Sequence, residues 1–143
     1  MTATITITNP ILGGMNPDPS WIWDDEFQRI VLVTSTFELV PGLPIYVSED
    51  MTCWKHVSNV IDADLARRLL IPFVDDSGGV YAPTLRRIHG KYVIACTIAR
   101  LDDRRAMEGG CTESELMRFH AAEGNFILEA DSIEGPWHGP FWI

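Results

Sequence analysis

An internal repeat constrains the fold of this chain more than any other feature of its sequence. Each copy begins with a proline-containing loop, runs through a short strand, a polar turn and an apolar strand, and later closes with a second polar turn. Trp54 and Trp137 end these closing turns, and each stands six positions after a polar residue. A repeat of this kind is typical of architectures in which similar units stack on one another.

Four short apolar runs predict β-strands, because they are rich in β-branched residues and bounded by residues that favour turns. They are residues 29–35, 44–47, 91–97 and 125–129. Units of about four strands are typical of β-propeller blades, in which the repeated tryptophan would pack between blades. The repeat therefore predicts an all-β fold, a partial β-propeller of about two blades. A β-sandwich is the competing all-β architecture.

Two segments break the β pattern. Residues 61–70 have helical spacing, with Asp62 near the start and Pro72 just beyond the end, and predict a helix. Residues 101–124 are polar, charged and interrupted by glycine. We expect them to form a long loop with no more than one helical turn.

The charge of the chain limits its partners. A formal net charge of −9 argues against a nucleic acid and against an anionic membrane surface. A neutral ligand such as a sugar is compatible with it. The four histidines are scattered without ligand spacing, so we expect no metal and no cofactor.

The cysteines and the first residues bear on location. The chain has three cysteines, with no C-x-x-C pair, and Cys96 lies in an apolar run that predicts a core position. Residues 1–8 have neither a basic region nor a continuous apolar stretch, unlike a signal peptide. These features predict a cytoplasmic protein with reduced thiols.

One carboxylate is placed in a way that suits chemistry. Asp18 stands between two prolines in the run Asn16-Pro17-Asp18-Pro19-Ser20, and these prolines stiffen the backbone on both sides. A general base or nucleophile needs such a fixed direction. The alternative is an ordinary turn aspartate, which is common in Asp-Pro sequences.

Four motifs in order carry a resemblance to a known family. They are the run around Asp18, Ser35-Thr36-Phe37, the turn that closes on Trp54, and Tyr81-Ala82-Pro83. Together they resemble the N-terminal part of family 43 glycoside hydrolases, of the β-xylosidase and α-L-arabinofuranosidase type. The resemblance covers nearly the whole chain and identifies residues 1–143 as an incomplete N-terminal part of that family's catalytic propeller domain.

The resemblance implies a five-bladed β-propeller and an inverting hydrolysis of β-1,4-xylosides or α-L-arabinofuranosides from hemicellulose. Asp18 matches the general base, and Phe37 and Tyr81 match positions that line the sugar pocket. Packing in the core is the alternative for both aromatic residues. Many relatives have tryptophan where Tyr81 and Leu39 stand, so the sugar preference stays open.

The family also uses a glutamate as general acid and a second aspartate that tunes the pKa of that acid. Neither has a match among the 143 residues, and both are expected in segments that follow Trp137 in relatives. The chain alone is therefore expected to be inactive and, with an exposed blade edge, to self-associate. A non-catalytic carbohydrate-binding or interaction module, or a non-functional gene fragment, are the alternatives.

Overall fold

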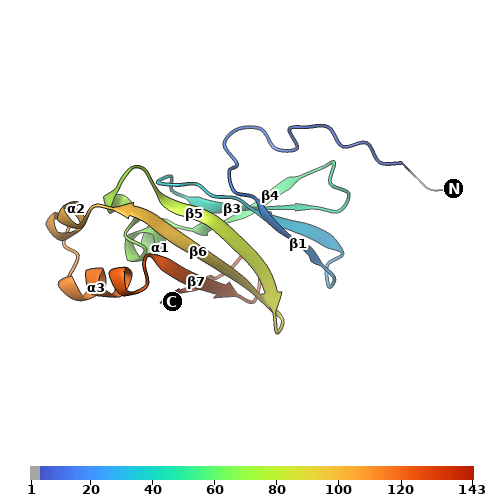
Figure 1. The fold of residues 1–143 in the computed structure, drawn as a ribbon. Helices are drawn as coiled ribbons and strands as arrows, with labels where there is room; N and C mark the ends of the chain where they lie inside the picture. The colour runs from blue at the N-terminus through green and yellow to red at the C-terminus, as the bar shows by residue number, and fades with distance from the viewer. Residues whose placement is uncertain (1–3) are drawn as a thin grey trace.

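Figure 1 shows the computed structural model of the chain, which describes residues 4–143. The strands form two four-stranded antiparallel sheets, and in each sheet they follow their order along the chain. The first sheet contains β1 (Ser20–Asp24), β2 (Arg29–Val33), β3 (Gly42–Ser48) and β4 (Lys55–Ile61). The second sheet contains β5 (Val74–Ile88), β6 (Lys91–Leu101), β7 (Asn125–Ala130) and β8 (His138–Trp142). The predicted all-β fold and its two repeated units are confirmed.

Each of the four predicted strands is present, as β2, β3, β6 and β7. β6 runs to Leu101, four residues beyond its predicted end. The polar strand β4 and the C-terminal strand β8 were not predicted, because their side chains do not alternate clearly between apolar and polar. Pairing with a neighbouring strand, rather than sequence pattern, sets these two.

The core lies between the two sheets and contains buried side chains from both. Along β6, buried and half-exposed residues alternate, as expected for a strand with one face on the core. The fully buried positions include Tyr92 and Ile94 from the second sheet and Val31 and Ile45 from the first. One apolar cluster joins these residues, so the two sheets form a single packed unit.

Polar contacts add to this packing where the sheets meet. Phe37 and Val80 form an isolated antiparallel bridge between the two repeat units, with N···O distances of 3.2 and 2.9 Å. Elsewhere, Ser58 Oγ donates a hydrogen bond of 2.6 Å to the carbonyl oxygen of Ile133.

The two repeated tryptophans differ in role. Trp137 is half-buried and packs against the core cluster, as the repeat predicts. Trp54 instead donates from Nε1 to the carbonyl oxygen of Met51 at 3.1 Å, and so stabilises its own turn.

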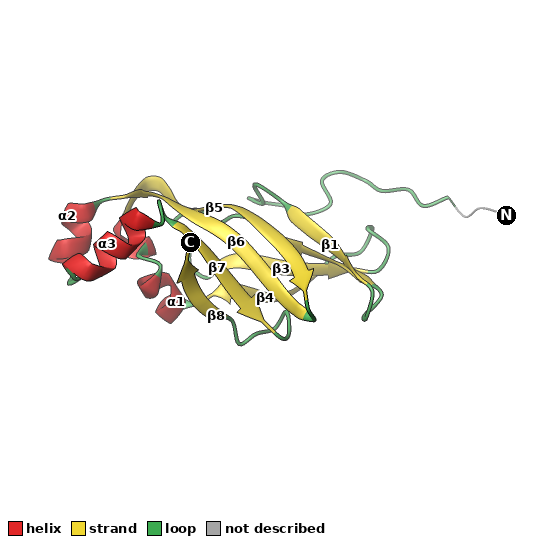
Figure 2. Cartoon of the chain, turned by 60° about the horizontal axis from the view of Figure 1, so that its bottom comes forward, coloured by secondary structure: helices red, strands yellow, loops and turns green. Residues whose placement is uncertain are grey.

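Helices gather at one end of the two sheets (Figure 2). The predicted helix at residues 61–70 is confirmed as α1 (Ala63–Arg68), followed by a 3-10 turn (Ile71–Phe73). Its N-cap is Asp62, whose side chain accepts from the Leu65 N–H at 2.8 Å.

The prediction of a long loop at residues 101–124 is wrong. This segment forms two helices, α2 (Asp103–Glu108) and α3 (Glu113–Ala121). Thr112 and Glu115 form a reciprocal capping box that starts α3. Leu116 and Phe119 then bury the same face of that helix, three positions apart.

Within residues 4–143, no helix is long and apolar enough to cross a membrane. The same residues hold no cluster of three or more side chains suited to a metal ion. Residues 1–3 lie outside the described part of the chain, and the expectation about a signal peptide, which concerns residues 1–8, falls partly on them.

Candidate active site

Asp18 lies in the loop that leads into β1 and is exposed. Pro19 disfavours the right-handed helical conformation for Asp18, and the backbone there is left-handed, with a φ of 50°. The carbonyl oxygen of Pro17 accepts a hydrogen bond of 2.9 Å from the N–H of Ser35. The loop is therefore tied to the chain just after β2, on the N-terminal side of the Asp18 carboxylate.

Two groups from distant parts of the chain contact the Asp18 carboxylate. Ser35 Oγ donates to Asp18 Oδ2 at 2.7 Å, and the Ala82 N–H lies 3.4 Å from the same oxygen. Ala82 N–H also donates to Ser35 Oγ, at 2.9 Å. Among the described residues these hydrogen bonds reach Oδ2 alone, so Oδ1 is available to accept a proton from water.

Three non-glycine residues around this carboxylate have a left-handed backbone. The φ angles are 50° at Asp18, 53° at Phe37 and 45° at Ala82. Each such conformation costs on the order of 1–3 kcal/mol, and such residues cluster at functional sites. The surrounding packing must offset this cost.

Gly79 makes the close approach of the two repeat units feasible. Its φ is +97°, and a Cβ at this position would lie 2.3 Å from the carbonyl oxygen of Phe37. Any other residue would separate Phe37 from Val80 and break the bridge between them.

The two predicted pocket aromatics lie together next to Asp18. The ring centroids of Phe37 and Tyr81 are 4.9 Å apart, with an interplanar angle of 59°. Both side chains are half-buried rather than enclosed in the core. Tyr81 donates its hydroxyl to the carbonyl oxygen of Ser77, which fixes the ring. The structure therefore brings together all three residues that the sequence singled out.

A hollow of about 360 Å³ adjoins this cluster through Ala82. Its other lining residues come from β6, β7 and the C-terminus, and include Cys96, Thr97 and Asn125. Burial raises the pKa of the Cys96 thiol to about 12, and the nearby Asp18 carboxylate adds to this. The Cys96 thiol donates to the carbonyl oxygen of Tyr81 at 3.0 Å. The thiol therefore stays protonated and supports the backbone beneath the aromatic pair.

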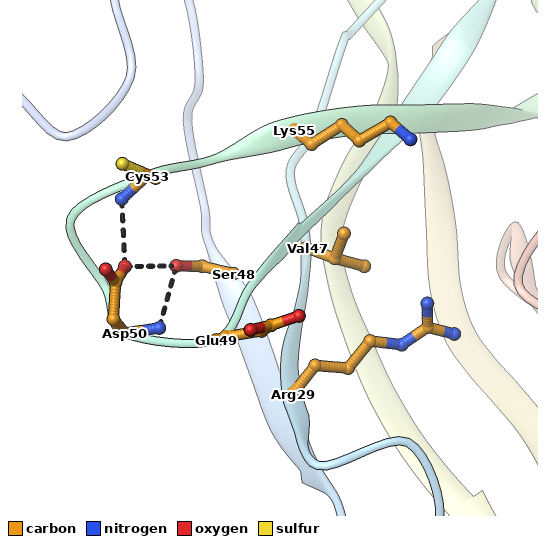
Figure 3. A pocket seen from close by; sticks show the side chains of 7 residues that line it. All are labelled: Arg29, Val47, Ser48, Glu49, Asp50, Cys53 and Lys55. Atoms are coloured by element: carbon orange, nitrogen blue, oxygen red, sulfur yellow. Dashed lines mark hydrogen bonds between the residues drawn. The ribbon is translucent and has the colours of Figure 1, made fainter.

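A second pocket of about 410 Å³ lies beside the turn between β3 and β4 (Figure 3). Asp50, one of its two acidic residues, accepts hydrogen bonds from the backbone N–H groups of Thr52 and Cys53, at 2.8 and 3.0 Å. Hydrogen bonds from the Thr52 hydroxyl and these backbone groups hold the pKa of Asp50 well below its usual range. This carboxylate therefore stabilises the turn.

Sequence analysis missed the partners of Asp18. Ser35 and Ala82 each stand in one of the four motifs, and Ser35 also ends a predicted strand, but neither was predicted to bind Asp18. Their contacts to Asp18 span 17 and 64 positions in the sequence. The Thr34-Ser35 pair at the end of an apolar strand was the only local signal, since small hydroxyl residues there are suited to binding a neighbouring carboxylate.

Comparisons with known proteins identify the family of the chain. The sequence profile described as "Glycosyl hydrolases family 43" matches residues 7–143. The chain belongs to glycosyl hydrolase family 43. Among its relatives is the putative beta-xylosidase of Escherichia coli, 39% identical over 134 residues, which cover 94% of this chain and 22% of that protein. Another is the non-reducing end alpha-L-arabinofuranosidase BoGH43B of Bacteroides ovatus, 36% identical over 140 residues, with 96% and 22% covered.

Solved structures of family 43 proteins superpose on the chain. The Bacteroides ovatus xyloglucan PUL GH43B protein matches with a TM-score of 0.72 and 34% identity, over 95% of this chain and 23% of that one. The xylan beta-1,4-xylosidase of Bacillus halodurans matches with a TM-score of 0.70 and 29% identity, over 96% of this chain and 23% of that one. The two sheets are thus part of a five-bladed β-propeller, and the chain spans about a fifth of the length of the family 43 relatives it matches.

Proposed function

We propose that this chain supplies the general base and part of the sugar pocket of an inverting glycosidase. The observation that carries the proposal is Asp18, an exposed carboxylate held by Ser35 and Ala82 beside two half-buried aromatic rings. In an inverting reaction, a carboxylate takes a proton from water as that water attacks the anomeric carbon, while a carboxylic acid protonates the leaving oxygen. Asp18 suits the first role.

The substrate class follows from the aromatic pair and from the relatives. Phe37 and Tyr81 offer an apolar ring surface beside a polar hydroxyl, which suits the mixed faces of a pyranose or furanose. Relatives are named as a xylosidase and an arabinofuranosidase. We therefore propose β-1,4-xylosides or α-L-arabinofuranosides from hemicellulose as substrates.

The general acid and the aspartate that tunes its pKa would come from segments that follow Trp137 in relatives. General acid–base help contributes about 10²–10⁴-fold to a rate, and an alkyl leaving group depends on the acid most. The 143-residue chain alone is therefore expected to show little or no turnover of a natural xyloside. Clear turnover by the pure chain would contradict this assignment of the missing groups.

A chimera tests the proposal directly. Residues 1–143 would replace the corresponding part of the Escherichia coli relative, and the product would be assayed with 4-nitrophenyl β-D-xyloside and α-L-arabinofuranoside. We expect turnover, and we expect Asp18→Asn to lower kcat by about 10²–10⁴-fold. The matched control is Asp25→Asn, an exposed carboxylate in the β1–β2 turn, which should leave kcat unchanged.

An Asp18→Asn chimera with unchanged kcat would remove Asp18 as the base. Sugar binding without hydrolysis, by a chimera that folds, would instead favour a carbohydrate-binding module. The intact mass of the native protein, read with the residues after Ile143, complements this test. A mass well above 16.1 kDa, with an aspartate motif and a later glutamate, would match the proposal.

We also propose that the chain alone self-associates. Large apolar side chains are exposed on β1 and near the C-terminus, among them Trp21 (56%), Phe141 (50%) and Ile143 (61%). Exposed apolar surface together with unpaired strand edges favours association. Sedimentation of the pure chain tests this proposal, since a stable monomer would contradict it.

We propose further that the native protein is cytoplasmic. Fractionation of the source cells tests this location.

A further inference from the structure

One face of β1 and the loop before it carries a row of polar side chains. Ser20 and Asp24 point to the same side of β1, with Ile22 between them, and Asp18 lies in the loop two positions before Ser20. Each contacts β5. The Ala82 N–H lies 3.4 Å from Asp18 Oδ2, and the Leu85 N–H donates to Ser20 Oγ at 3.0 Å.

The third contact of this row is an ion pair. Arg87 donates to Asp24 Oδ1 at 2.6 Å. The partners on β5 advance in the same direction as the residues on β1, so the two segments run parallel. We call the contacts Asp18–Ala82, Ser20–Leu85 and Asp24–Arg87 the interface row.

β1 and β5 belong to different sheets and share no ladder of backbone hydrogen bonds; the isolated Phe37–Val80 bridge is the backbone link described between β5 and the first unit. Apolar packing between two sheets tolerates small sliding movements, because it is not directional. Hydrogen bonds and ion pairs are directional. The interface row is therefore well placed to set the axial register of β5 against β1.

The Asp24 end of the row is the most firmly held. Asp24 is fully buried, and its carboxylate accepts hydrogen bonds from Arg87 and from the hydroxyl of Tyr92. Arg29 Nε lies 3.8 Å from its other oxygen. A buried carboxylate with three such partners has one favourable position, because moving it would leave buried charges unpaired.

We propose that Ser20 and Asp24 are positioning residues that set the register of β1 against β5 and thereby hold the Ala82 N–H against the Ser35–Asp18 pair. This inference deepens the proposed function, since it gives the Asp18 site a support in β1, two to six positions further along the chain. Sliding of β5 along β1 would lengthen the contacts of the Ala82 N–H with Ser35 Oγ and Asp18 Oδ2.

Amide hydrogen exchange of the chimera described above, followed by mass spectrometry of overlapping peptides, tests the inference without any need for turnover. For each amide, the quantity compared is the exchange rate in the variant divided by the rate in the unchanged protein. We expect Asp24→Asn to raise this ratio about tenfold more for the Ala82 amide than for core amides such as that of Leu128. Ser20→Ala should have the same selective effect, of roughly threefold, because it removes one contact of the row. The control is Glu26→Gln, which alters the exposed second partner of Arg87. This variant should change the exchange rate of neither the Ala82 amide nor the core amides.

A uniform rise over all amides would mean that Asp24 only stabilises the fold, and would overturn the inference. If Asp24→Asn prevents folding, Ser20→Ala decides, because it removes one neutral hydrogen bond and no charge. A failed glycosidase assay leaves this experiment intact, whereas unchanged Ala82 exchange in the folded Ser20→Ala chimera rejects the positioning role whatever the activity.

Discussion

The two ends of the interface between β1 and β5 use the same residue type in opposite ways. At one end, Asp18 is exposed and its partners are neutral, a hydroxyl group and a backbone amide. At the other end, Asp24 is fully buried and its partners include two guanidinium groups. One carboxylate is exposed to solvent, and the other is buried and paired with cations.

The difference lies in what each set of partners does to the carboxylate charge. Neutral donors orient a carboxylate without cancelling its negative charge, which a base needs when it takes a proton from water. Paired cations cancel the charge and permit burial, which gives rigidity at the expense of reactivity.

The largest expected effect is at the buried end. Asp24→Ala leaves Arg87 and Arg29 without their shared partner, and should lower the free energy of unfolding by about 3–5 kcal/mol. Urea unfolding of the chain measures this. Asp18→Asn should change the same quantity by less than about 1 kcal/mol, because the site is exposed. Equal losses in the free energy of unfolding for Asp24→Ala and Asp18→Asn would contradict the contrast between the buried and the exposed carboxylate.

The next effect is at the buried partner of Asp18. Ser35 is fully buried, and its hydroxyl links Asp18 to the Ala82 amide. Ser35→Ala should lower the free energy of unfolding by about 1–3 kcal/mol, because the Ala82 N–H loses its shorter hydrogen bond. The control is Ser77→Ala, an exposed position whose carbonyl contact to Tyr81 is kept. A Ser35→Ala loss no larger than that of the control would contradict the described geometry.

A smaller effect concerns pH at the buried end. Burial and the hydrogen bond to Asp24 raise the pKa of Tyr92 to about 12. A tyrosine whose folded pKa lies above its unfolded pKa of about 10 stabilises the fold below pH 10, and this contribution is lost as the pH rises to about 12. Tyr92→Phe should cost about 1 kcal/mol at pH 7 and flatten the fall in stability between pH 10 and 12. An unchanged slope would show that Tyr92 does not titrate in this way.

The mildest test alters no residue. Cys53 is exposed, whereas Cys96 is buried beneath the Asp18 site with a pKa raised to about 12. In the folded chain at pH 8, Cys53 should react rapidly with a disulfide reagent such as DTNB, and Cys96 only on unfolding. Peptide mapping after brief labelling identifies the modified thiol. Early labelling of Cys96 would mean that the site end opens more than the described packing permits.

Local patterns predicted much of the fold and one part of the site. The short apolar runs predicted four strands, because period-two burial on one core face is visible in the sequence. The capping box at Thr112 and Glu115 was also visible, and the loop predicted at residues 101–124 was wrong because polarity was given more weight than this signal. Asp18, Phe37 and Tyr81 were singled out because each stands in a short motif of the family resemblance, and their roles stay predictions.

The sequence by itself determined the repeat, the strands and the stiff turn that presents Asp18, since these depend on residues that are near one another along the chain. Only the tertiary structure decided which groups hold that carboxylate. Ala82 and Arg87 come to β1 from 64 and 63 positions away. Contacts of this kind depend on how two separate sheets pack and register against one another. No local sequence pattern predicts which residues so far apart along the chain will meet.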